Sequence, residues 1–137
     1  MRWVTERRPH VDRCASAWFV RRFVDRNPTF LFIDRDEPPP AKATPYDLPA
    51  ARFGHKGRRV TFDAFLAAYH RRDKGLSRLA DLVRDVDLGS FRIPESRGLD
   101  TLLYGLLLAE PDDREILRQT TPVFEGLYRY YLGEGRR

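Results

Sequence analysis

The segment VDRCASAWFVRRFVD, residues Val11–Asp25, has the spacing of a helix that is apolar around almost its whole circumference. A helix of this kind is usually buried. The breaker Pro9 precedes it, Asp12 is a suitable N-cap, and Asn27-Pro28 ends it. We therefore expect the rest of the chain to be organised around this helix. Its main apolar stripe consists of Val11, Cys14, Ala15 and Trp18.

Four later stretches also have apolar residues at helical spacing. Thr61 caps the first of them, and Gly75 separates it from the second. The third runs from about Ser96 to Ala109, and Pro111-Asp112 opens the last. We expect Pro122 to kink or split this last helix near residues 120–121, because proline lacks the backbone donor that a helix interior needs.

Strand signals are confined to the N-terminal half. Arg2–Thr5 and the apolar run Thr29–Ile33 are predicted strands, and Arg52–Val60 is a predicted hairpin that turns at Lys56-Gly57. The stretches 34–49 and 85–96 are expected to be loops. The pattern predicts an α+β fold: a mostly helical single domain over residues 1–137, with four to six helices, a small sheet or hairpin and a frayed tail from Gly133.

The composition narrows the possible functions. All but three of the 25 basic residues are arginine, and they alternate with 20 acidic residues, so a mixed solvated surface is expected despite the net charge of +5. No nucleic-acid-binding motif occurs, and direct nucleic-acid binding is not expected. The chain contains no apolar run of membrane-spanning length and no signal-peptide pattern, which predicts a cytoplasmic protein without a membrane partner. The single cysteine, Cys14, is expected to be a buried, inert thiol.

The arginines of the first helix have two interpretations. On the helical wheel Arg22 lies close to the apolar stripe and Arg13 lies near Val20. A buried ion needs a partner, so Arg21 and Arg22 either pair with Asp25 and more distant acids or lie at an edge with their stems on apolar surface. In the alternative interpretation, guanidinium groups held in an apolar wall form an anion pocket.

A metal site is the other candidate. His55 lies at a strand end, Asp63 follows on the next helix, and imidazole and carboxylate groups on adjoining elements can converge on one cation. Acids of the aperiodic stretch 85–96, among them Asp87 and Glu95, either complete such a site or receive the arginines. No HExxH or similar spacing fixes the ligands, and His55 and Asp63 are equally readable as a turn residue and a helix-dipole partner.

The opening MRWVTERRPHVDRCASAWFVRRFVD and the later GHKGRRVTFDAFLAAY resemble the C-terminal domain family of the chromate resistance protein ChrB. The likeness extends over essentially the whole chain, including VRDVD and PESRGLD. The residues of this chain that match the family's pattern, and that the resemblance marks as candidate functional residues, are Asp12, Arg13, Trp18, Arg21, Arg22, His55, Phe62, Asp63, Asp87 and Glu95.

The resemblance also implies a role. Full-length members look like transcription regulators with a separate N-terminal DNA-binding domain, and their C-terminal part is thought to sense chromate or support resistance. We expect this chain to be a stand-alone sensor or accessory domain. Many relatives have Cys-Pro-Trp where this chain has Ser16-Ala17-Trp18, and a cysteine in place of Val60, so we do not expect chromium chemistry at thiols here.

The sequence thus predicts a small cytoplasmic domain that binds an oxyanion or a metal and is linked to chromate resistance or sensing. Its oxyanion pocket would use Arg13, Arg21, Arg22 and Trp18, and its metal site would hold one divalent or transition metal ion through His55, Asp63, Asp87 and Glu95. The expected partners are a chromate-like inorganic oxyanion or a metal, with a homo-oligomer also considered. The alternatives are a mononuclear metal-dependent enzyme, redox or hydrolytic, and a nucleic-acid or protein interaction module.

Overall fold

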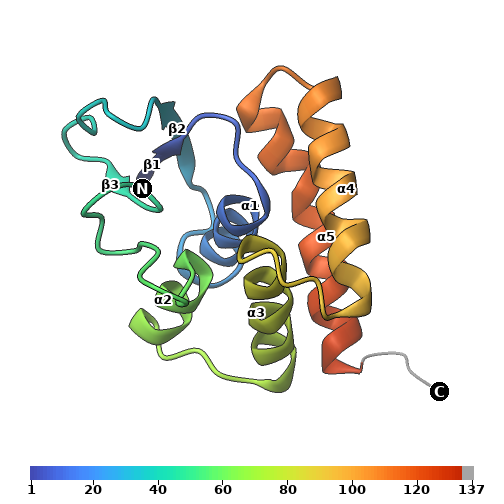
Figure 1. Cartoon of the computed structure of the whole chain (residues 1–137). Coiled ribbons are helices and arrows are strands. Elements are labelled where there is room, and N and C mark those ends of the chain that lie inside the picture. Colours follow the sequence, from blue (N-terminus) through green and yellow to red (C-terminus); the bar gives the residue numbers. More distant parts are fainter. Residues whose placement is uncertain (134–137) are drawn as a thin grey trace.

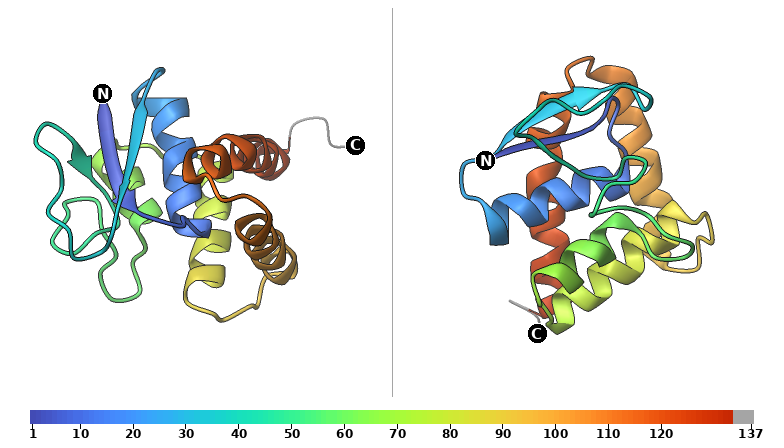
Figure 2. Two further views of the ribbon diagram at one scale, coloured as in Figure 1. Left: turned by 90° about the horizontal axis from the view of Figure 1, so that it is seen from above. Right: turned by 90° about the vertical axis from the view of Figure 1, so that its left-hand side faces the viewer.

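Helix α1 (Val11–Phe19) lies at the centre of the computed structural model, which describes residues 1–133. It runs between a small sheet and the remaining helices, and it contacts α2, α3, α4 and α5 (Figure 1). All of its residues except Arg13 are buried, which confirms the prediction of a helix without a solvent face. Viewed from above, α1 separates the strands from α5 (Figure 2).

The first helix does not continue as an α-helix to residue 25. After Phe19 the chain widens into a π-helical segment, η1 (Val20–Val24), in which the Asp25 amide bonds the Val20 carbonyl at 2.8 Å. The wider turn changes which residues share a face, so a regular α-helical wheel misplaces the side chains beyond Phe19. Phe23 packs on both Trp18 and Phe19, with ring centroids 5.8 and 5.1 Å apart.

The sheet is parallel and has the strand order β2-β1-β3. Strands β1 (Arg2–Glu6) and β2 (Thr29–Ile33) flank α1 in the chain, as predicted. The third strand is the short β3 (Thr44–Pro45), within a stretch expected to be irregular. The predicted hairpin at residues 52–60 is reduced to one antiparallel bridge, Lys56 with Arg59, so its turn lies at residues 57–58.

Four further α-helices complete the α+β fold. They are α2 (Thr61–Ala68), α3 (Lys74–Asp87), α4 (Pro94–Ala109) and α5 (Asp113–Leu132). One expectation was wrong in detail: residues 85–87 belong to α3 rather than to a loop. Helix α5 is continuous through Pro122, so the proline does not split it, and the expected kink stays a prediction. The hydroxyl groups of Thr120 and Thr121 both bond the Leu117 carbonyl just before this proline.

Arg8 links the loop between β1 and α1 to the turn between α4 and α5. Its guanidinium donates to the carbonyls of Leu107, Glu110 and Pro111 and pairs with Asp113, and so satisfies acceptors at the end of α4.

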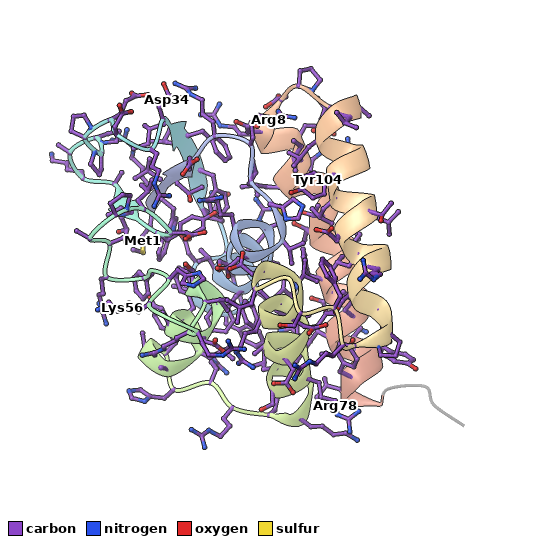
Figure 3. All side chains as sticks on the ribbon, in the orientation of Figure 1. Met1, Arg8, Asp34, Lys56, Arg78 and Tyr104 are labelled. Atoms are coloured by element: carbon purple, nitrogen blue, oxygen red, sulfur yellow. The ribbon has the colours of Figure 1, made fainter. Side chains whose placement is uncertain are left out.

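Charged residues such as Asp34, Lys56 and Arg78 lie at the periphery (Figure 3). Within residues 1–133, no helix is both long and apolar enough to cross a membrane. Most of the tail predicted to fray, residues 134–137, lies outside the described residues.

Candidate metal site and arginine cavity

Asp12 is buried in the first turn of α1, with 3% of its surface exposed, but it does not cap its own helix. Its two carboxylate oxygens accept the backbone amides of Thr61 and Phe62, each at 2.9 Å. These amides belong to the first turn of α2, where backbone donors lack partners within the helix. Asp12 therefore caps α2 from a distant part of the sequence and fixes α1 against it.

His55 lies in the loop that leads to α2, and both of its ring nitrogens have a partner. Nε2 lies 2.7 Å from the Gly57 carbonyl oxygen, which can only accept, so Nε2 carries the proton. Nδ1 faces Asp87 Oδ2 at 3.2 Å. This arrangement leaves Nδ1 without a proton, and metal-binding histidines usually donate their other ring N–H to such an acceptor.

Asp87, the last residue of α3, completes a cluster with Asp12 and His55. One ligand atom from each residue lies within 4.8 Å of the other two. Metal–ligand bonds of about 2.0–2.2 Å would require these atoms to lie closer together around a bound ion. Asp12 is buried, whereas His55 and Asp87 are partly open to solvent, so the cluster lies at the surface with one buried wall.

The carboxylates of this cluster are destabilised as anions. Burial, followed by the neighbouring charges of Asp47 and Asp87, raises the pKa of Asp12 to about 8, although its two backbone donors oppose the shift. Burial also raises the pKa of Asp87. On the same side of the molecule, Arg13 pairs with Glu6 and Asp47, with 3.3 Å between the charged atoms of each pair. A bound cation would relieve the unfavourable burial of negative charge.

His10 adds a second imidazole nearby. It lies beside Asp100, with Nε2 3.5 Å from the carboxylate, and its ring packs on Tyr104 with 4.3 Å between centroids. Burial lowers the pKa of His10. Its electrostatic interaction with Asp87 connects it to the cluster, but it is not one of the three grouped ligands.

The structure separates the arginines that the sequence analysis combined. Arg13 and Arg21 are eight residues apart, about 12 Å along a helix axis. Arg21 donates to the Thr121 hydroxyl at 3.3 Å, and Arg22 pairs with Glu125 at the same distance. The indole N–H of Trp18 also donates to Glu125, at 2.9 Å. Trp18 is buried, so its side chain is part of the hydrophobic core.

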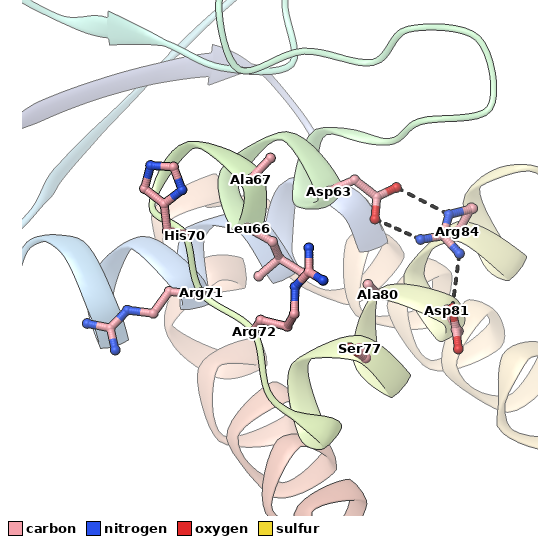
Figure 4. A pocket seen from close by; sticks show the side chains of 10 residues that line it. All are labelled: Asp63, Leu66, Ala67, His70, Arg71, Arg72, Ser77, Ala80, Asp81 and Arg84. Carbon is pink, nitrogen blue, oxygen red and sulfur yellow. Dashed lines mark hydrogen bonds and ion pairs between the residues drawn. The ribbon is translucent and has the colours of Figure 1, made fainter.

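Two of the four predicted metal ligands lie elsewhere. Asp63 forms a bidentate pair with Arg84, at 2.7 and 3.2 Å, and also accepts the Val60 amide. This pair borders a surface cavity of about 580 Å³ between α2 and α3 (Figure 4). Glu95 accepts the hydroxyl of Tyr131. His55 and Asp87 are brought together, whereas Asp63 and Glu95 are engaged in contacts between helices.

Cys14 is buried, and desolvation raises the pKa of its thiol to about 12. The thiol would therefore be protonated at neutral pH and a poor nucleophile or ligand. This agrees with the expectation of an inert thiol.

Comparison with known proteins extends over nearly the whole chain. A family model described as "ChrB, C-terminal domain" matches residues 3–131. The curated relative "Protein ChrB" of Cupriavidus metallidurans is 34% identical over 136 residues, which are 98% of this chain and 42% of the relative. The chain thus spans about two fifths of that relative's length. No solved structure gave a significant match.

Proposed function

Because the chain belongs to the family of ChrB C-terminal domains, we propose that it is a metal- and oxyanion-binding domain linked to chromate resistance or sensing. The metal half of this proposal places one divalent or transition metal ion between Asp12, His55 and Asp87.

The convergence of these three side chains carries the proposal. They come from α1, the loop before α2 and the end of α3, and their ligand atoms lie within 4.8 Å of one another. Two carboxyl groups with raised pKa values share this space, which is costly for the metal-free protein. A cation would convert that repulsion into attraction.

The donor set favours a transition metal over calcium or magnesium. Imidazole suits zinc, iron, nickel and copper, whereas calcium and magnesium prefer all-oxygen sites. The backbone carbonyl of Gly57, which accepts the Nε2 proton, would orient the His55 ring in the bound state. Asp12 would be oriented in the same way by the two amides of α2.

The oxyanion half of the proposal follows from the small number of protein ligands. Three ligands leave coordination positions open, and water or an oxyanion oxygen can occupy them. Arg13 already pairs with Glu6 and Asp47, so the positive charge that attracts an oxyanion here would come from the bound cation. A chromate-like dianion is the ligand that the family relationship suggests.

Elemental analysis of untagged protein purified without chelator tests the metal site. We expect close to one transition metal ion per wild-type chain, and less than about a tenth of that in His55→Ala and Asp87→Asn, because removing one ligand from a weakly chelating set greatly lowers affinity. His70→Asn is the matched control. His70 is exposed, lies outside the cluster and has a positive φ of 51°, which asparagine tolerates.

Equal metal content in wild type and His55→Ala would refute the site. So would a wild-type protein that neither retains metal nor binds added Zn²⁺, Fe²⁺ or Mn²⁺. In either case His55 and Asp87 would form only a surface contact that holds no metal.

A mononuclear metal-dependent enzyme is the second candidate, because a solvent-facing metal with open positions can also act on a ligand. Binding alone predicts that chromate added to the metal-loaded protein with a slow external reductant disappears no faster than in the protein-free mixture. Multiple turnovers per chain that are lost in His55→Ala would favour the enzyme.

A further inference from the structure

A cavity of about 340 Å³ borders η1, and its lining is dominated by arginine. Arg21, Arg22 and Arg26 come from η1 and the residues just after it, and Arg71 comes from the turn between α2 and α3. Phe23, Val24 and Asp25 complete the lining. None of these residues belongs to the Asp12–His55–Asp87 cluster.

The cavity has an excess of positive charge. Asp25, its one lining carboxylate, is already occupied: it pairs with the Met1 amine at 2.8 Å and accepts the Trp3 indole N–H at 3.3 Å. Arg21 contacts a hydroxyl rather than a carboxylate. Across residues 1–133, no carboxylate lies within ion-pair distance of Arg26 or Arg71.

Aromatic rings help to hold three of these side chains, and Arg22 in addition pairs with the Glu125 carboxylate at 3.3 Å. The guanidinium carbons of Arg22 and Arg71 lie 5.0 and 4.9 Å from the centroid of the same Phe23 ring. That of Arg21 lies 5.7 Å from the Phe30 ring. A guanidinium held over a ring is positioned by its face and keeps N–H groups along its edges for another partner.

The π-helical turn brings the two arginine-bearing segments together. It places Phe23 where Arg71 can reach it from the turn after α2. In Figure 4 the Arg71 side chain extends away from that of Arg72, although Arg71 also lines the cavity between α2 and α3. Two cations beside one ring repel each other, and an anion between them would reverse that interaction.

We propose that this η1 cavity is an anion site, separate from the metal cluster, that takes a small tetrahedral dianion between Arg21, Arg22 and Arg71. Guanidinium groups recognise such oxyanions by paired N–H donors. The volume lies at the lower end of the range for small-ligand sites, which suits an inorganic ion with its bridging waters. The site goes beyond the proposed metal site and does not depend on it.

Calorimetric titration of the full chain with sodium sulfate, against sodium chloride at equal ionic strength, tests this inference. We expect saturable sulfate binding that chloride does not reproduce. Arg21→Gln and Arg71→Gln should each weaken it at least about ten-fold, as expected for the loss of a charge-assisted pair of donors. Arg71→Lys should weaken it less than Arg71→Gln, and Arg78→Gln on α3 removes an equal charge elsewhere and should leave it unchanged.

Circular dichroism of each variant checks that the fold is retained, and Arg71, an exposed turn residue, can be replaced without disturbing the core. Unchanged sulfate affinity in Arg71→Gln, or an equal response to chloride, overturns the inference. Repeating the titration after chelation separates the two proposals. Sulfate binding lost with the metal or in His55→Ala would assign the anion to the metal cluster instead, whereas failure of the metal site alone leaves the sulfate titration unaffected.

Discussion

Replacing Asp12 with alanine should destabilise the metal-free protein by about 2–4 kcal/mol, because two backbone donors of α2 lose their acceptor inside the core. Thr61 and Phe62 each donate to this carboxylate at 2.9 Å, and both are fully buried, so water cannot replace it without opening the contact between α1 and α2. The expected cost is a large share of the roughly 5–15 kcal/mol of a typical domain.

Urea denaturation in chelator, followed by the fluorescence of the buried Trp3 and Trp18, measures this cost. Chelation ensures that the loss of a metal ligand does not contribute. Asp36→Ala is the control: Asp36 is exposed in the loop after β2, and its replacement should change stability by less than about 0.5 kcal/mol. A loss below about 1 kcal/mol in Asp12→Ala would refute the capping role.

The stability of the protein should also depend on pH through the ionisation of Asp12. The pKa of Asp12 is raised to about 8 in the folded protein, so the folded state binds a proton that the unfolded state releases between about pH 4 and 8. Wild-type stability should therefore fall as pH rises through this range. The advantage of wild type over Asp12→Asn, which cannot titrate, should shrink as pH rises. An advantage that grows with pH would show that the two amides outweigh burial.

Two further predictions concern helix packing and helix capping. Gly75→Ala should destabilise the folded protein by about 1–3 kcal/mol, because the new Cβ would lie 2.8 Å from side-chain atoms of Leu132 and Tyr128. Gly105→Ala on α4 is the control, because a Cβ there meets nothing within 4 Å. It should leave stability unchanged or raise it by up to about 1 kcal/mol. Similar thermal midpoints for the two variants would contradict this. Burial opposes ionisation of Asp85, but the hydrogen-bond donors around the start of α4 outweigh burial and lower the pKa of this carboxyl group. The ionised carboxylate therefore stabilises the fold at pH values above the unfolded-state pKa of Asp85. This stabilisation is lost as the pH falls below that value. Acid unfolding followed by circular dichroism should thus be less steep below about pH 4 in Asp85→Asn.

The expected homo-oligomer stays a prediction. Leu102, Tyr104 and Leu108 leave exposed apolar surface on α4, with 66%, 56% and 90% of their surfaces accessible. Sedimentation of the purified chain would measure its oligomeric state directly.

Local pattern was sufficient for most of the helices. Helix α1 was predicted from apolar residues on every side, and α2 to α5 from apolar stripes whose period depends only on helix geometry. The π-helical turn was not predicted, because the sequence 20–24 has the same apolar spacing in either helix type and packing against Trp18 and Phe19 accompanies the wider turn.

The candidate site was only half predictable. His55 and Asp87 were identified by residue type and position, but their nearness depends on where the loop before α2 meets the end of α3. Asp12 was assigned to its own helix, because an acid in a first turn has the same sequence signature whichever helix it caps. The resemblance at Asp12-Arg13 was the one available signal that this acid mattered.

The sequence by itself determined the fold class, the central buried helix and the inert thiol, because these follow from composition and short-range order; the family followed from the resemblance of several motifs and from comparison with relatives. Tertiary structure alone decided which charges meet. It joined Asp12 with Asp87, separated Arg13 from Arg21 and Arg22, and brought Arg71 to Phe23. Contacts between side chains 40 or more residues apart depend on how whole elements pack, and no local periodicity encodes that packing.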